Sequence, residues 1–172
     1  MKKLITTVAI FVFALVFSND IQAQKFDGLN KSPADIVLSP KRGEKVVKIV
    51  YSRPQLDGRS LSKLAPAGKV WRTGANEATQ ITFYKDVTFG GKAIKAGTYS
   101  LFTIPGEKEW TIIINSATND WGAYAYKDSK DVARVSGKVS KSDKSIEAFS
   151  MTVSNGSLHL GWANTIVSVS LK

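Results

Sequence analysis

The stretch Phe149-Ser-Met-Thr-Val-Ser-Asn-Gly-Ser-Leu-His-Leu-Gly-Trp162 decides the fold. Asn155-Gly156 at its centre suits a two-residue type I′ turn, in which both positions need a positive φ. Counting outward from this turn puts every apolar residue on one face and the polar residues on the other. The apolar cross-strand pairs are Val153 with Leu158, Met151 with Leu160 and Phe149 with Trp162. Because a one-residue slip would move this apolar set to the solvent face, the stretch predicts a β-hairpin in one register.

The same alternation of apolar and polar residues runs through the rest of the chain. It is visible at residues 47–51, 79–83, 110–114 and 167–171. Gly90-Gly91 predicts a second hairpin with Val87 opposite Ile94, and Pro105-Gly106-Glu107-Lys108 joins strands at 98–104 and 109–114. Residues 119–131 lack strand character and predict a packed loop or a short helical turn. About nine or ten short strands without helical crossovers predict an all-β, single-domain antiparallel β-sandwich, jelly-roll-like or closed into a flattened barrel.

The first residues predict an export signal. Lys2 and Lys3 precede an uncharged apolar run, and Ile21-Gln22-Ala23 offers a small residue before a cleavage site. The run is too short to span a bilayer comfortably, because a membrane helix needs about 20 apolar residues. We therefore expect a signal peptide at 1–23 and a protein that does not span the membrane. Since the chain has no cysteine to carry a lipid anchor, a periplasmic or secreted location is expected.

The segment that follows differs in kind from the strands. Ser32-Pro33 and Ser39-Pro40 stand among charged residues, which is typical of an extended arm lying on the surface or partly disordered. The expected organisation is therefore an N-terminal arm at 24–44 and a β-sandwich domain at 45–172.

Composition excludes several kinds of site. With no cysteine and His159 as the single histidine, no usual zinc set and no thiol catalysis can form. No glycine-rich loop opens a helix, so we expect neither a nucleotide site nor any other cofactor or metal. The net charge of +10 suits anionic envelope polymers. The lysines are scattered, however, and form no basic stripe or known module, so nucleic acid is not an expected partner.

One segment crowds hydrogen-bonding side chains together. Lys69-Val-Trp-Arg-Thr-Gly-Ala-Asn-Glu-Ala-Thr79 lies between two apolar runs. Arginine offers a planar charged fork for carboxylate or phosphate, and tryptophan offers a flat apolar face for a sugar ring. The candidate ligand-binding residues here and just upstream are Arg53, Arg59, Trp71, Arg72, Asn76 and Glu77. They suit an anionic or carbohydrate ligand of the cell envelope.

Two other interpretations of these residues stay open. Glu77 could pair with Arg72 or Arg53, with Trp71 as a core plug, which would make the segment a structural lock. Alternatively, Glu77 could act as the acid or base of a hydrolase or lyase on an envelope or matrix polymer. Glycoside hydrolysis needs a second carboxylate, and the sequence singles none out. The catalytic residues are therefore unassigned, and a non-catalytic binding module is the leading hypothesis.

Several of these segments resemble the motifs of a known family. They are Tyr51-Ser-Arg-Pro54 with Gly58-Arg59, Gly68 to Thr79, Lys95 to Gly106 and Trp121-Gly-Ala-Tyr124. In this order they resemble the exported bacterial domain of unknown function numbered 2911, over residues 33–172. The resemblance implies an export signal, a single β domain and a motif centred on Arg53, Trp71, Arg72, Asn76 and Glu77. It implies no activity.

The chain departs from that family pattern in two places. Ser60-Leu-Ser-Lys-Leu64 replaces an aromatic residue and paired glycines, and Ala163 stands where an acidic residue is expected after Trp162. The second departure further weakens an enzyme that would need two carboxylates.

Overall fold

The structure, a computed structural model, describes residues 28–172. The expected signal peptide at 1–23 and the start of the arm lie outside these residues. The elements are β1 (Ala34–Ser39), β2 (Val47–Ser52), α2 (Leu61–Leu64), β3 (Thr79–Phe83), β4 (Val87–Phe89), β5 (Lys92–Ile94), β6 (Gly97–Ile104), β7 (Glu109–Asn115), the 3-10 helix η1 (Asp128–Lys130), β8 (Asp131–Ser154) and β9 (Ser157–Ser170).

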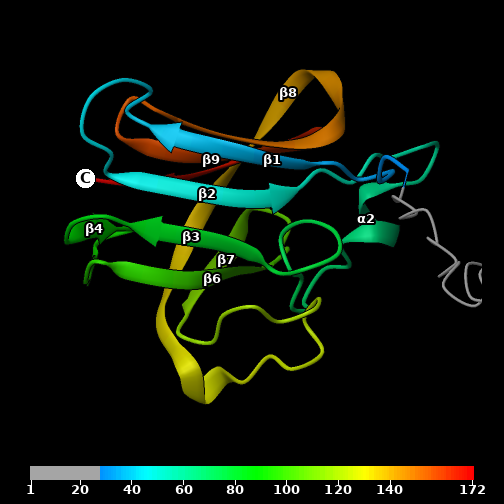
Figure 1. Ribbon diagram of the computed structural model, residues 1–172. Helices are drawn as coiled ribbons and strands as arrows, with labels where there is room; N and C mark the ends of the chain where they lie inside the picture. The colour runs from blue at the N-terminus through cyan, green and yellow to red at the C-terminus, as the bar shows by residue number, and fades with distance from the viewer. Residues whose placement is uncertain (1–27) are drawn as a thin grey trace, which may run out of the picture.

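One curled antiparallel sheet makes up most of the molecule. Its seven strands follow the order β1-β2-β3-β6-β7-β8-β9, and β4 and β5 form a separate small hairpin. The long β8 pairs with β7 through residues 131–138 and then continues beside β9. Figure 1 shows how this curl brings the two ends of the sheet, β1 with β2 and β8 with β9, to the same side. The all-β fold is confirmed, and the flattened barrel is the better description of its shape.

The barrel is held shut by the segment just after β2. Gln55 forms an isolated antiparallel bridge with Ala148 on β8. The Leu56 amide donates to the Glu147 carbonyl at 3.0 Å, and the Phe149 amide donates to the Pro54 carbonyl at 2.9 Å. The two ends of the sheet are therefore joined at one point along β8.

The predicted hairpin is confirmed in its turn and in its first two apolar pairs. Asn155 and Gly156 have φ of 49° and 68°, and Val153 and Met151 pair with Leu158 and Leu160. The third predicted pair is not a ladder partner, because the register shifts between Ile146 and Ser150. Phe149 and Trp162 nevertheless pack ring to ring at 5.7 Å, both buried. The Gly90-Gly91 hairpin also has the expected register, with Val87 opposite Ile94.

The N-terminal arm contains a strand that the sequence did not predict. Residues 34–39 form β1, which pairs with β2 along its whole length. The edge strand of the main sheet therefore lies before residue 45, within the expected arm. Its pattern was missed because only Val37 among its large apolar residues faces the core, while Ile36 and Leu38 are 58% and 39% exposed.

An aromatic cluster fills the end of the barrel near the closing point. Trp71 stacks on Trp162 with ring centroids 5.3 Å apart and planes inclined by 15°. It also meets Phe149 and Trp110 edge to face, at 5.0 and 6.1 Å. All four side chains are buried, so this cluster is a major part of the hydrophobic core.

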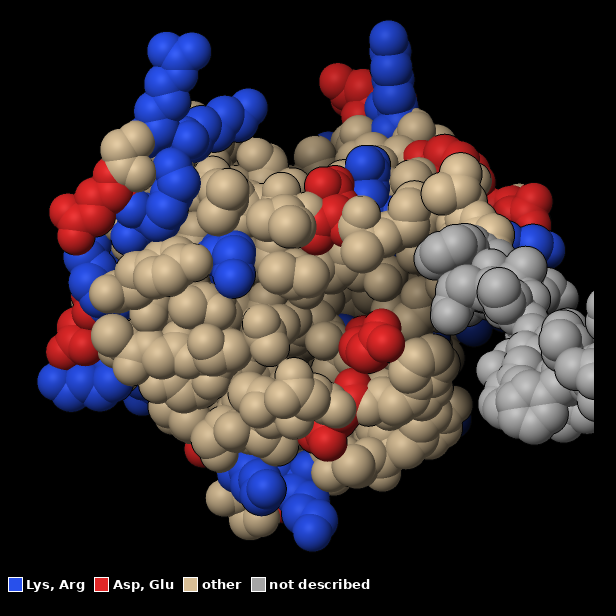
Figure 2. Space-filling model, viewed as in Figure 1, with Lys and Arg blue, Asp and Glu red and all other residues tan. Residues whose placement is uncertain are grey.

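The charged surface agrees with the scattered distribution seen in the sequence. On the face shown in Figure 2, basic side chains stand mostly around the outline, with several at the upper left, and acidic side chains also lie toward the middle of the face. Among residues 28–172, no helix has the length and apolar character needed to cross a membrane.

Candidate functional site

The segment from Trp71 to Thr79, here called the signature loop, is fastened to the sheet at both ends. Trp71 exchanges two backbone hydrogen bonds with Thr103 on β6, of 2.7 and 2.9 Å. At the other end the Thr79 amide donates to the Arg72 carbonyl at 3.1 Å, just where β3 begins. The loop therefore leaves and re-enters the sheet at nearly the same place.

Two residues of the signature loop have a strained backbone. Thr73 and Asn76 have φ of 58° and 60°. This region is uncommon for residues other than glycine, and especially so for a β-branched threonine. Thr73 is fully buried, its hydroxyl donates to Thr103 Oγ1 at 3.2 Å, and its carbonyl accepts the Thr79 hydroxyl at 2.7 Å. Such over-determined strain is typical of functional sites.

Gly74 permits the tight packing of the signature loop against β2. A Cβ at this position would lie 3.0 Å from the Ser52 carbonyl oxygen and 3.2 Å from Thr79 Oγ1. Because the first of these neighbours is backbone, a larger residue would require the loop or the strand to shift by a few tenths of an ångström.

A second loop, residues 116–127, lies against the signature loop. The Ala78 amide donates to the Asp120 carbonyl at 2.9 Å, and the Gly122 amide donates to the Asn76 carbonyl at 3.0 Å. Glu77 and Trp121 form an isolated bridge between these bonds. We call residues 72–78 together with 119–124 the paired-loop surface.

Asn115 and a small polar cluster organise the second loop. The Asn115 side chain is fully buried, donates to the Lys127 carbonyl and to Asp131 Oδ1, and accepts the Ala117 amide. The Tyr126 hydroxyl donates to Asp131 Oδ2 at 2.7 Å, and Arg134 Nε donates to the same oxygen at 2.7 Å. Burial of the ring, followed by the hydrogen bond to Asp131, raises the pKa of Tyr126 to about 12.

This raised pKa predicts a loss of stability at high pH. A tyrosine has a pKa near 10 when unfolded, so the contribution of Tyr126 is complete below about pH 10 and disappears as the pH rises through about 12. Urea unfolding across this range is expected to show a shallower decline for Tyr126→Phe than for the natural protein. Tyr124→Phe, at an 86% exposed position, is the matched control and is expected to keep the natural slope. Equal slopes for the natural protein and Tyr126→Phe would contradict this account.

Two buried polar atoms on the paired-loop surface have no hydrogen-bond partner. Among the described residues, only Arg72 Nε and Asp120 Oδ2 are buried side-chain polar atoms left in this state. Beside them, Trp121 and Tyr124 are 61% and 86% exposed, although both are large aromatic residues. Buried polar groups are nearly always satisfied, so two exceptions at one pair of loops set this surface apart from the rest of the described chain.

The structure gives three of the six candidate residues internal contacts. Trp71 lies in the core, 7% exposed, where it matches a core plug and cannot offer a free face to a ligand. Arg53 donates from Nε to the Phe149 carbonyl and from a terminal nitrogen to Ser150 Oγ, and it pairs with Asp35 at 3.3 Å. Arg59 donates to the carbonyls of Leu56 and Gln55.

The other three candidates, Arg72, Asn76 and Glu77, lie together in the signature loop. Glu77 is exposed, and within residues 28–172 it forms no ion pair with Arg72 or Arg53. The hypothesis that Glu77 fastens the loop through an ion pair with Arg72 or Arg53 is therefore wrong for the described chain. Arg53 forms its ion pair with Asp35 instead.

Three residues of the paired-loop surface are not among the candidates that the sequence predicted. Asp120, Trp121 and Tyr124 lie on the segment 119–131, which was expected to be a packed loop. Tyr126 fits this expectation, because its ring centroid lies 5.1 Å from that of Phe102. Trp121 and Tyr124 do not fit it, because both are exposed. The short helical turn is confirmed as η1. The available signal was the run Trp121-Gly-Ala-Tyr124, which accompanied the signature segment in the family pattern.

No group of three or more potential metal ligands comes together among the described residues. His159 Nδ1 lies 2.7 Å from Ser168 Oγ, and its Nε2 lies 3.3 Å from the Ser154 carbonyl oxygen. Since no carboxylate belongs to this set within the described chain, it does not form a catalytic triad.

A family model described as "Protein of unknown function (DUF2911)" matches residues 32–171. The match contains both loops of the paired-loop surface. Comparison with curated proteins and with solved structures gave no match.

Proposed function

The chain belongs to the DUF2911 family of proteins of unknown function, and we propose that it acts as an exported, non-catalytic module that binds an anionic sugar of a cell-envelope polymer. The proposed site is the paired-loop surface. Export to the periplasm or the cell exterior is part of the proposal and rests on the apolar N-terminal run with its two leading lysines.

The observation that carries the proposal is the pair of unpartnered buried atoms, Arg72 Nε and Asp120 Oδ2, beside two exposed aromatic rings. Burying a polar group without a partner costs about 1–3 kcal/mol. A fold that holds a donor and an acceptor in this state, on a strained loop, is prepared for a ligand that supplies the missing partners.

Each part of the surface suits one feature of such a ligand. The guanidinium of Arg72 can bind a sugar carboxylate, and the carboxylates of Asp120 and Glu77 can accept hydrogen bonds from hydroxyl groups. Trp121 provides the flat apolar face for the sugar ring that was first expected of Trp71. Trp71 supports the loop from inside the core.

Binding to defined polysaccharides tests the proposal. Calorimetry with a polyuronate and with neutral dextran is expected to show binding of the polyuronate alone. Trp121→Ala and Arg72→Met are each expected to weaken it at least about tenfold, because each removes about 1.4 kcal/mol or more. Tyr84→Ala is the control, since Tyr84 is 49% exposed and lies outside the paired loops. Full binding by both site variants, or equal binding of dextran, would contradict the proposal.

A hydrolase or lyase is the second candidate, favoured by one observation. The backbone bond from Ala78 to Asp120 brings a second carboxylate next to the residue that follows Glu77. Glycosidases use two carboxyl groups about 5–10 Å apart. Release of reducing ends or unsaturated sugars from the polyuronate by the natural protein, lost in both Glu77→Gln and Asp120→Asn, would establish this function. Binding without any turnover would eliminate it.

A further inference from the structure

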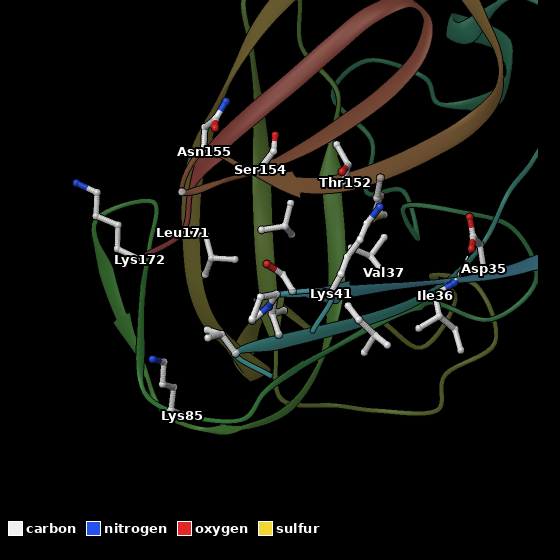
Figure 3. A pocket seen from close by; sticks show the side chains of 18 residues that line it. Asp35, Ile36, Val37, Lys41, Lys85, Thr152, Ser154, Asn155, Leu171 and Lys172 are labelled. Carbon is white, nitrogen blue, oxygen red and sulfur yellow. Dashed lines mark hydrogen bonds between the residues drawn. The ribbon is translucent and has the colours of Figure 1, made fainter. Parts of the chain in front are cut away.

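A second concave site lies at the seam of the barrel, away from the paired loops. A groove of about 890 Å³ runs between β1 and the last part of β8, residues 151–154, and is shown in Figure 3. Among residues 28–172, β1 pairs only with β2, and this part of β8 pairs only with β9. The curl of the sheet therefore leaves two strand edges facing each other without a ladder between them.

One end of the groove is closed by a polar cluster around Asp35. Its carboxylate accepts hydrogen bonds from the Tyr51 hydroxyl at 3.2 Å and from Arg53 at 3.3 Å, and it also accepts the Ile36 amide at 2.8 Å. The Met151 amide on the opposite edge donates to the Tyr51 hydroxyl at 2.9 Å. Side chains therefore occupy two of the edge amides, those of Ile36 and Met151, near the Asp35 end of the groove.

The floor of the groove is apolar. Val47, Met151 and Leu171 are all less than 9% exposed, and Val37 and Val153 pack against the same core. Ile36 and Leu38, which also line the groove, keep large exposed fractions. A groove of this size and lining falls in the range of small-ligand sites, which are about 300–1,000 Å³ and mostly apolar.

The other end of the groove is basic. Lys85 and Lys172 stand there, opposite the Asp35 end (Figure 3), and Lys41 lines the groove as well. Within the described chain none of the three forms an ion pair. The lining side chains include one acid, Asp35, which Arg53 neutralises. The groove thus combines an apolar length with two lysines, Lys85 and Lys172, at one end and with Lys41 along its length.

We propose that this groove binds a single-chain anionic amphiphile, a long-chain fatty acid or a molecule of the same build. The acyl chain lies on the valine, methionine and leucine floor, where each methylene removed from water favours binding. The anionic head lies at the lysine end, away from Asp35. This site shares no residue with the paired-loop surface and does not depend on the function proposed for it.

Displacement of a fluorescent fatty acid from the purified protein tests the proposal. Oleate at submicellar concentration is expected to displace it, and oleyl alcohol and oleylamine, which have the same chain length, are expected to compete at least about fivefold less well. Affinity for oleate is expected to fall with added salt, because exposed lysines are screened. Equal competition by the three compounds, or none by any, would overturn the proposal.

Variants place the binding in the groove. Lys85→Glu is expected to weaken oleate at least about fivefold and to leave oleyl alcohol unchanged. Lys144→Glu makes the same charge change at an exposed position outside the groove and is expected to have no effect. Val153→Asp is expected to abolish displacement by placing a charge on the floor. Circular dichroism checks that Val153→Asp folds. If Val153→Asp does not fold, the result for Lys85→Glu alone decides whether oleate binds in the groove. Natural affinity in Lys85→Glu would overturn the groove assignment.

Discussion

Replacing Trp71 by alanine is expected to destabilise the protein by about 3–5 kcal/mol, the usual cost of removing a large buried aromatic side chain. Trp71 is 7% exposed and is surrounded by Trp162, Phe149 and Trp110, with ring centroids 5.0 to 6.1 Å away. The cavity would lie at the point where the ends of the sheet meet. In a domain of this size the unfolding midpoint is expected to fall by very roughly 10 °C or more.

Scanning calorimetry or thermal circular dichroism measures this change. Trp121→Ala makes the same substitution at a position that is 61% exposed, and it is expected to change the unfolding free energy by less than about 0.5 kcal/mol. This difference in unfolding midpoint would show that Trp71 belongs to the core and Trp121 to the surface. Similar unfolding midpoints for Trp71→Ala and Trp121→Ala would contradict this assignment.

The second large effect is expected at Arg53. From a position just after β2, its guanidinium connects two strands: it pairs with Asp35 on β1, and it donates to the Phe149 carbonyl at 3.0 Å and to Ser150 Oγ at 2.7 Å on β8. Arg53→Met keeps the aliphatic stem and removes these bonds, and it leaves an unpaired carboxylate at the closed end of the groove. We expect a loss of about 2–3 kcal/mol, since each hydrogen bond contributes about 1 kcal/mol and one involves a charge pair.

Chemical unfolding in urea measures the Arg53→Met effect. Arg59→Met is the matched control, because the Arg59 hydrogen bonds reach only the nearby carbonyls of Leu56 and Gln55 and the residue is exposed. It is expected to cost less than about 1 kcal/mol. An equal loss in both variants would mean that Arg53 does not fasten β1 and β2 to β8.

The sequence predicted the strands that alternate cleanly and the turns that need glycine. Asn155-Gly156 and Gly90-Gly91 fixed two hairpins because their positive φ is available to few other residues. The edge strand β1 escaped prediction because an edge buries one face incompletely, and its outward Ile36 and Leu38 obscure the alternation. The bulges in β8 between Lys141 and Ser150 depend on the curl of the sheet, and the local sequence pattern does not predict that curl.

The candidate site lies on the segment that the sequence singled out, and the contacts of its residues could not be predicted. Crowding of polar residues pointed to the signature loop, and Arg72, Asn76 and Glu77 do lie together on it. Whether a tryptophan faces solvent or the core depends on how its backbone pairs with the neighbouring strand. The backbone of Trp71 pairs with Thr103 on β6, and its ring is buried in the core. Asp120 was missed because its place beside the loop comes from a long-range backbone pairing.

The most direct test of the binding site compares stability and binding in the same two variants, Arg72→Met and Glu77→Ala. Glu77 is exposed, and Arg72 Nε is buried without a partner, so neither residue supports the fold through an ion pair within the described chain. Unfolding midpoints within about 3 °C of the natural protein, together with at least about tenfold weaker polyuronate binding, are the predicted result. A drop of very roughly 10 °C in both variants with unchanged binding would contradict the account and make the signature loop a structural lock.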